Sequence, residues 1–566
     1  MERAQIHFEL FVRKTHASGW TLDLATEDRA RALEVAEEAL GEKRAIAVKV
    51  TKETLDEETR EYRTVTILTK GEAERTKSKA PTETLEPLCV SPQDLYTGHA
   101  RERIGRLLDA WLVRNKATPF ELLHRADLIE RLDASGLELQ HAIQKVAIPE
   151  AQARSQSVHE VIRNLQRLVQ ASIDRVLRDA RKGTLPNLNK ESFAKLAERL
   201  VGEPERHYLL GAAVASGIAG ATNWREKVNR LLDLADAAPT QPQARVLAFS
   251  VIGEPLAEAL GTRAGIGELI GEQADLGSML AAMTRLAAAD SVEALVGIEP
   301  AVARVMPQLE GAAARLANWL DGPYFGRVRA AIAKRVLKEL VGPRRLRNAD
   351  PEGEIIVLRA LAMALTAASG RLLSLEDVQT AFVERSKMLV RPDFVEGYIG
   401  TERTPQGEVE ALLWLAENVT GAANKRQACR WILATVGALK FENAVRASLD
   451  PPVAKLTALA DLQRSVARAG FAPEDAAPIA ARIGEVGGMV EAEARLTAQL
   501  GKAGAPVVNR LQILLRFAAG EACPHGPAAD RAKAEVLRLM RAPENREAIS
   551  KAPEVLDKLS GLVQAA

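Results

Sequence analysis

Residues 149–182, PEAQARSQSVHEVIRNLQRLVQASIDRVLRDARK, set the pattern for most of this chain. Seam positions recur here in alternating steps of four and three, as they do on one face of a packed helix. These positions are Val158, Ile162, Leu165, Val169, Ser172 and Val176. The spacing predicts one continuous helix over 149–182, roughly 50 Å long. It favours packing against other helices of the same chain and leaves open a homo-oligomer that pairs through the helix at 150–182.

The chain beyond residue 93 repeats this helical character. Among its 566 residues, 47% are hydrophobic and only 4% aromatic, a composition typical of packed helices. Short connections with Pro or Gly separate the helical patterns, no strand pattern interrupts them, and no fixed repeat period emerges. Further helices are predicted at 204–220, 222–237, 241–260, 299–320, 322–341, 351–370, 374–389, 405–419, 424–447, 452–469, 473–500, 505–520 and 526–541.

The first 70 residues differ from the rest. Hydrophobic side chains alternate with polar ones from Ile6 to Val12, which indicates a half-buried strand. A turn at 16–19, a second strand to Leu24, a helix capped by Thr26, and strands at 46–50 and 62–68 follow. The order β-β-α-β-β predicts a small α/β module with an antiparallel sheet.

The predicted fold class is therefore mainly α, with this small module preceding a large irregular helical array or set of bundles. Residues 71–92 are polar, contain three prolines and show no periodicity, so they are predicted to form a linker. We divide the chain into the module at 1–70, the linker at 71–92, and all-α regions at 93–348 and 349–566.

Charge and cysteine content narrow the functional classes. The formal net charge is +1, and a protein that neutralises many phosphates needs a basic excess, so nucleic-acid binding is disfavoured. Cys89, Cys429 and Cys523 lie far apart and form no disulfide pattern, which indicates a reducing compartment, the cytoplasm. No apolar run reaches the length of a membrane span, and the first residues do not resemble a secretion signal.

Two motifs suggest chemistry but have simpler explanations. Ser192-Phe-Ala-Lys195 matches the S-x-x-K of some acyl-transfer enzymes, yet the chain has no Lys-Thr-Gly, and a helix capped by Asn189 explains the residues. Cys523 and His525 are too few to make a structural zinc site. We predict no catalytic residue, no bound cofactor and no metal ligand.

Two further stretches suggest binding to the phosphate groups of a ligand or of a nucleic acid. The glycines of 261–271 resemble a phosphate loop, but the pattern is not G-x-G-x-x-G and no strand precedes it. The basic stretch 342–348, GPRRLRN, suits a nucleic acid, although a run of this kind is usually a solvated face or helix terminus. Neither stretch predicts a site.

The most distinctive stretch is 385–399, which gathers aromatic and basic side chains around a proline in an aromatic-poor chain. Such residues are enriched at protein interfaces, although Phe394 and Tyr398 also have the i, i+4 spacing of helix core residues. The candidate interaction surface comprises Arg385, Lys387, Met388, Phe394 and Tyr398.

These features favour a cytoplasmic protein-interaction or scaffold protein, with a helical body, an N-terminal recognition module and partners of unknown identity. One alternative is an enzyme or ligand sensor whose site is assembled between helices, although a non-enzymatic role is favoured. A second alternative is a nucleic-acid-binding protein.

Overall fold

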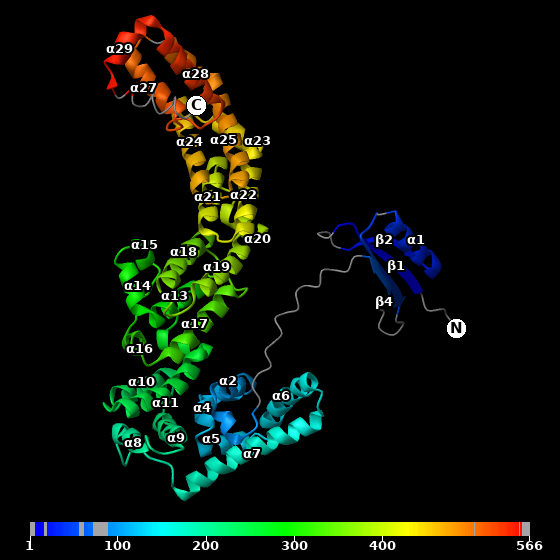
Figure 1. The fold of residues 1–566 in the computed structure, drawn as a ribbon, viewed down its shortest axis with the longest axis vertical. Coiled ribbons are helices and arrows are strands. Elements are labelled where there is room, and N and C mark those ends of the chain that lie inside the picture. Colours follow the sequence, from blue (N-terminus) through cyan, green and yellow to red (C-terminus); the bar gives the residue numbers. More distant parts are fainter. Residues whose placement is uncertain are drawn as a thin grey trace. The chain divides into compact units, whose positions relative to one another are not determined.

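The computed structural model describes residues 6–15, 20–42, 44–55, 62–71, 89–502, 504–553 and 555–556. Within these residues the chain forms one four-stranded sheet and 29 α-helices (Figure 1). It divides into two compact units, Met1–Leu88 and Cys89–Ala566. The predicted fold class, a small α/β module followed by a mainly helical body, is confirmed. Most of the predicted linker, 72–88, lies outside the described residues.

The first unit has the predicted β-β-α-β-β order. Its elements are β1 (Ile6–Arg13), β2 (Thr21–Thr26), α1 (Arg29–Gly41), β3 (Ala47–Leu55) and β4 (Tyr62–Gly71). The strands pair antiparallel in the order β2-β1-β3-β4, which leaves β2 and β4 at the edges of the sheet. The turn predicted at 16–19 lies outside the described residues.

The helix of this unit starts two residues later than predicted. Asp28, not Thr26, is the N-cap, and its carboxylate accepts from the backbone N–H groups of Ala30 and Arg31. Thr26 supports the cap instead, because its hydroxyl accepts from the N–H of Asp28 at 3.1 Å. A carboxylate is the stronger acceptor at a helix N-terminus, where the dipole favours negative charge.

The sheet buries one face against α1. Phe8, Leu10 and Val12 of β1 are buried and alternate with half-buried polar or aromatic residues, as the sequence period of two predicts. They form an apolar core with valines of β3 and with Ala32 and Ala36 of α1. On the opposite face the ammonium of Lys49 lies 4.9 Å from the ring centre of Phe11 and 5.6 Å from that of Trp20.

The second unit begins with η1 (Pro92–Tyr96) and short helices, then a long one. These helices are α2 (Gly98–Leu107), α3 (Asp109–Arg114), α4 (Pro119–Leu122), α5 (Ala126–Ala134), α6 (Glu138–Arg154) and α7 (Val158–Lys182). The prediction of one continuous helix over 149–182 is wrong, because two helices occupy this range. Ser155 takes a left-handed conformation at φ 55° and ends α6, and Ser157 caps α7. The polar Ser-Gln-Ser segment offers no seam residue between the two helices, so the chain turns there.

The buried face of α7 is also rotated slightly from the predicted seam. Val161, Leu168, Ser172 and Val176 are buried, whereas Leu165 and Val169 are half-buried. This face packs against α5, α6 and η1 of the same chain. The contacts match the packing that the sequence favours, and the homo-oligomer through 150–182 stays a prediction.

Helices α8 to α20 form the next part of this unit. They are α8 (Phe193–Leu200), α9 (Arg206–Ile218), α10 (Trp224–Asp236), α11 (Pro242–Gly261), α12 (Arg263–Ile270), α13 (Leu276–Ala287), α14 (Ala289–Val296), α15 (Pro300–Ala303), α16 (Gly311–Asp321), α17 (Gly326–Val341), α18 (Pro351–Ala367), α19 (Leu375–Leu389) and α20 (Pro392–Ile399). The single helix predicted over 299–320 is two helices, because Met306 to Glu310 is non-helical and includes Pro307.

The remaining helices complete the chain. They are α21 (Pro405–Asn418), α22 (Ala422–Gly437), α23 (Leu439–Ala447), α24 (Pro452–Arg468), α25 (Pro473–Ala494), α26 (Leu496–Lys502), α27 (Val507–Ala518), α28 (Pro527–Arg541), η2 (Pro543–Asn545) and α29 (Arg546–Ser550). The predicted helix over 473–500 breaks at Arg495, which is left-handed at φ 51°, and that over 424–447 breaks at Ala438.

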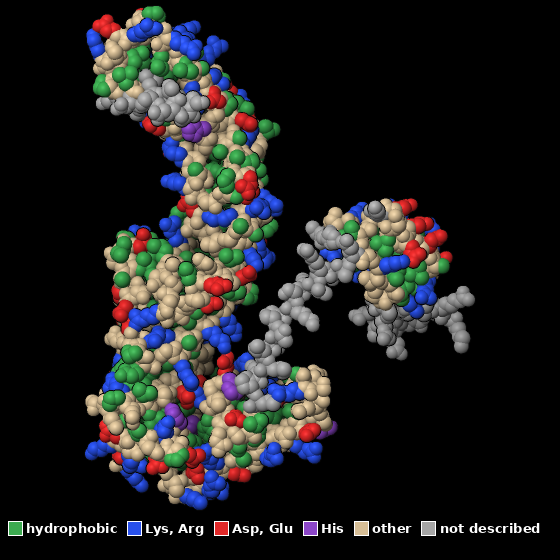
Figure 2. Space-filling view, viewed as in Figure 1, with side chains coloured by type: hydrophobic (Ala, Val, Ile, Leu, Met, Phe, Trp, Pro, Cys, Tyr) green, Lys and Arg blue, Asp and Glu red, His purple; other side chains and the backbone are tan. Residues whose placement is uncertain are grey.

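One apolar cluster extends through most of the second unit, from Phe120 to Val555. The boundary predicted between 348 and 349 falls inside it, since Leu346 and Ile355 belong to the same cluster. Charged side chains of both signs are interspersed over the face of this unit seen in Figure 2.

Candidate functional site

A polar pocket lies where the α12–α13 connection meets the loop between α17 and α18. Its volume is about 620 Å³, and residues from 263–279 and 344–350 line it. It therefore brings together the glycine stretch 261–271 and the basic stretch 342–348. The sequence of neither stretch predicts a site.

One backbone hydrogen bond joins the two sides of the pocket, and a helix cap fixes the segment on each side. The carboxylate of Asp275 caps α13 by accepting from the N–H of Ser278 at 2.7 Å, and Asp350 caps α18 by accepting from Gly353 at 2.7 Å. The N–H of Gly277 donates to the carbonyl of Leu346 at 3.1 Å, which ties the start of α13 to the basic loop. Helix caps and a backbone hydrogen bond thus fix the walls of the pocket.

The charged groups of the pocket differ in whether they have partners. Arg347 lies between two carboxylates, with its Nε 3.1 Å from Asp275 and its Nη1 3.2 Å from Asp350. Arg263 and Arg344 are exposed, and their side chains form no hydrogen bond or ion pair with the described residues; the same is true of Glu272. Two guanidinium groups and one carboxylate of the lining are therefore unpaired.

A buried ion network lies against the basic loop. Glu354, only 1% exposed, accepts from Arg345 Nε at 2.9 Å and from Arg385 Nη2 at 2.8 Å. Arg385 also donates to the backbone carbonyls of Gly342 and Arg344, so it holds the loop that carries the basic side chains. Burial lowers the pKa of Arg385, and the charge of Glu354 opposes that effect. Two guanidinium groups share one carboxylate here, which leaves positive charge in excess.

Arg345 connects this network to the pocket. It lines the pocket, and its guanidinium lies 4.8 Å from the ring centre of Phe394. Its Nη2 atom is buried and donates to no described atom. A buried donor without an acceptor is costly, so this atom is suited to an additional acceptor.

The five residues of the candidate interaction surface are divided between the protein core and the solvent-exposed surface. Arg385, Phe394 and Tyr398 are buried, Met388 is half-buried, and Lys387 is exposed and pairs with Glu384 at 2.5 Å. Two of the five, Arg385 and Phe394, touch the arginines of the basic loop. An interaction role for these five residues stays a prediction, and most of their side-chain area is used inside the protein.

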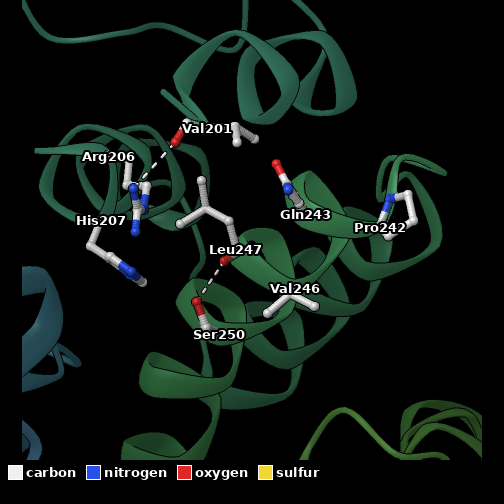
Figure 3. A pocket seen from close by; sticks show the side chains of 8 residues that line it. All are labelled: Val201, Arg206, His207, Pro242, Gln243, Val246, Leu247 and Ser250. Carbon is white, nitrogen blue, oxygen red and sulfur yellow. Dashed lines mark hydrogen bonds between the residues drawn. The ribbon is translucent and has the colours of Figure 1, made fainter. Parts of the chain in front are cut away.

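A second pocket, of about 520 Å³, lies between the α8–α9 connection and the start of α11 (Figure 3). Its lining is largely apolar, with Val201, Val246 and Leu247. The polar groups drawn with dashed lines are satisfied locally: Arg206 donates to the carbonyl of Val201 at 3.3 Å, and Ser250 to that of Leu247 at 2.7 Å. Fewer polar groups remain there to orient a ligand.

Outside these two pockets, a buried polar cluster connects the first helices of this unit to α9–α11. Arg101 Nε donates to Glu258 at 2.6 Å, and Lys227 pairs with the fully buried Glu121 at 2.5 Å. The ring Nδ1–H of the neighbouring His124 donates to the carbonyl of Phe120 at 2.7 Å, and burial lowers the pKa of His124 to about 4. His124 lines neither of the pockets described, so we assign the cluster a structural role.

The motifs of the sequence analysis show no reactive geometry. Ser192, not Asn189, is the N-cap of α8, and neither Ser192 nor Lys195 forms a side-chain hydrogen bond with a described residue. Cys523 is buried, and burial raises its pKa to about 12, so its thiol stays protonated. Among the described residues, no three His, Cys, Asp or Glu side chains converge as metal ligands would.

Comparison with known proteins gives no match: no family model, no curated protein and no solved structure is similar to this chain. The helices of the described residues also include none with the length and apolar character needed to cross a bilayer.

Proposed function

We propose that this chain is a cytoplasmic protein-interaction protein, in which the first unit recognises a partner and the helical unit supplies a second surface. The observation that carries the proposal is that the first unit buries its own apolar core against α1 and is a separate compact unit. A module with its own core can present a surface without relying on the helical unit. The three free cysteines suit a reducing compartment.

The edge strand β4 is the best candidate for the recognition surface. It is ten residues long, lies at the end of the strand order, and contains no proline in YRTVTILTKG. An edge of this kind accepts an extended segment of a partner through backbone hydrogen bonds. Threonine, valine and isoleucine dominate the strand, and such residues favour extended pairing.

Proline variants test this strand addition. Along an edge strand, alternate residues direct their N–H groups toward the neighbouring strand and away from it, so of Thr69 and Lys70 one donates to β3 and the other faces outward. Thr69→Pro and Lys70→Pro should therefore differ: one destabilises the first unit, and the other leaves its melting temperature unchanged but abolishes partner binding.

The assay is affinity purification from the native cell with the full chain, residues 1–88 and residues 89–566. The proposal expects the same protein with the full chain and with residues 1–88, and its loss with the outward proline. Recovery of that partner by residues 89–566 alone, or full binding by both proline variants, would contradict it.

A second candidate function is a ligand sensor, favoured by the pocket between α12 and the basic loop. Unpaired arginines converge there on a space of about 620 Å³, within the range of small-molecule sites. Nothing in this arrangement supplies a nucleophile with a base, so binding rather than catalysis is the better candidate. A thermal-shift screen on the full chain tests whether any small molecule stabilises it.

A further inference from the structure

We propose that the pocket between α12 and the basic loop binds a small phosphate ester, with Arg263, Arg344 and Arg345 as its anion-binding residues. This inference is independent of partner recognition by the first unit and names the ligand class for the sensor candidate. It rests on three observations: unpaired cations, a buried donor without an acceptor, and a glycine that opens space at the wall.

The unpaired cations come first. The carboxylates of Asp275 and Asp350 cap helices and pair with Arg347, so they are already engaged. Arg263 and Arg344 have no such partner among the described residues, and only Glu272 of the lining opposes them. A phosphate monoester carries nearly two negative charges at neutral pH, which matches two free guanidinium groups better than a single carboxylate does.

Positive charge also surrounds the lining. Arg345 and Arg385 share Glu354, so one cation of that network is uncompensated, and the buried Nη2 of Arg345 has no described acceptor. An anion bound among these groups would relieve their mutual repulsion.

The α12 wall of the pocket has space for a ligand to approach the backbone at Gly267. Gly267 lines the pocket in the middle of α12, and a Cβ added there would meet no atom within 4 Å. Ile270, Leu276 and Met279 line the same pocket and offer apolar contact for the organic part of the ester. The volume of about 620 Å³ suits a ligand of sugar-phosphate or nucleotide size.

Gly267→Leu gives the sharpest test, because it fills space in the pocket and keeps all three arginines in the chain. Leucine favours a helix over glycine, and its Cβ would meet no atom within 4 Å at this position, so the variant should fold at least as well as the parent. Gly397→Leu is the matched control: Gly397 lies inside α20, another helix of eight residues, and its added Cβ also meets nothing within 4 Å.

The probes are inorganic phosphate, ribose 5-phosphate, AMP and ATP, measured by calorimetry and thermal shift on the full chain, with citrate as a non-phosphate anion. We expect at least one phosphate ester to bind with a dissociation constant of about 1 mM or lower. Gly267→Leu should abolish this binding and Gly397→Leu should preserve it. Arg263→Gln and Arg344→Gln should each weaken it about tenfold, whereas the exposed Arg516→Gln should not.

Three outcomes would overturn the inference. The first is that no phosphate ester binds, and the second is that the Gly267→Leu variant binds as well as the parent. The third is a different ligand class: citrate binding as tightly as the best ester, or a single-stranded RNA oligonucleotide binding more tightly with a steep salt dependence.

Discussion

The imidazole of His124 occupies the space beside Gly211 in which any other residue would place its Cβ. A Cβ added at Gly211 would lie 2.6 Å from His124 Nε2, well inside contact distance. Gly211 is buried within α9, where alanine would ordinarily be the better helix former. The close approach of ring and backbone therefore explains why a glycine stands in the interior of this helix.

Gly211→Ala should destabilise the protein, by about 2 kcal/mol, because the ring of His124 has to move in a packed core. The control is Gly397→Ala in α20, whose new methyl group meets nothing within 4 Å and should stabilise by about 0.5 kcal/mol or more. Denaturant unfolding of both variants checks the opposite signs. A stabilising Gly211→Ala would show that the ring of His124 does not constrain this position.

Stability should fall between pH 7 and pH 5 because of His124. Burial lowers its pKa from 6.5 to about 4; Arg101 and Arg175 add to this effect, and the carbonyl of Phe120 opposes it. In this window the unfolded chain takes up a proton that the folded protein excludes, so the stabilisation is complete above about pH 6.5 and is lost toward pH 4. We expect a loss of about 2 kcal/mol by pH 5 from this group.

His124→Gln isolates this contribution, because glutamine can still donate to the carbonyl of Phe120 but does not titrate. The difference in unfolding free energy between pH 7 and pH 5 should shrink in His124→Gln and stay unchanged in His141→Gln, whose histidine is exposed. Equal pH dependence in all three proteins would place the responsible group elsewhere.

Glu354→Gln should destabilise the helical unit strongly, by about 3 kcal/mol, since it leaves the buried guanidinium of Arg385 and that of Arg345 without a counter-charge. The neighbouring Glu352→Gln should change stability by less than about 0.5 kcal/mol, because Glu352 is 65% exposed in its pair with Arg403. Thermal unfolding of the two variants distinguishes the buried network from a surface ion pair. Similar melting temperatures would contradict a stabilising role for Glu354.

Leu168→Asp should destabilise more than Leu165→Asp. Leu168 is 6% exposed in α7, whereas Leu165 is half-buried, so only the first variant buries an unpaired carboxylate fully. We expect about 3 kcal/mol for Leu168→Asp. Light scattering on the folded Leu165→Asp variant tests the oligomer at the same time: a halved mass would show that this face of α7 joins two copies.

Removal of residues 1–88 should leave the unfolding transition of the helical unit almost unchanged, because the two units have separate apolar clusters. Calorimetry of residues 89–566 against the full chain checks this, and limited proteolysis should cut first between residues 70 and 92. Aggregation of the truncated protein would show that the helical unit depends on the module.

Local patterns were sufficient to predict the sheet and most helices. The alternation from Ile6 to Val12 predicted β1, and the helical pattern over 374–389 predicted α19, because both depend on residues close in the chain. The break at Ser155 was missed because a short polar segment inside a heptad-like pattern permits either a turn or a continuous helix. Tertiary packing makes that choice.

The pocket could not be predicted in the same way. Gly267 and Arg344 belong to stretches that lack any shared pattern, and only the fold brings them to one cavity. Arg385 did stand out in the sequence, but as a surface candidate. Its true neighbours, Glu354 and the carbonyls at 342 and 344, depend on how α17, α18 and α19 pack.

The clamp formed by Arg385 also has a consequence for the integrity of the backbone. The guanidinium of Arg385 in α19 donates to the carbonyls of Gly342 and Arg344, which lie in the first part of the loop, and to the carboxylate of Glu354, which follows it. Hydrogen bonds therefore connect the two ends of the loop. The hydrophobic cluster spans the same place, with Leu346 and Ile355 buried in it. A peptide-bond nick at Asn348 would therefore not separate the two pieces, and this loop is a natural place to divide the protein into complementing fragments.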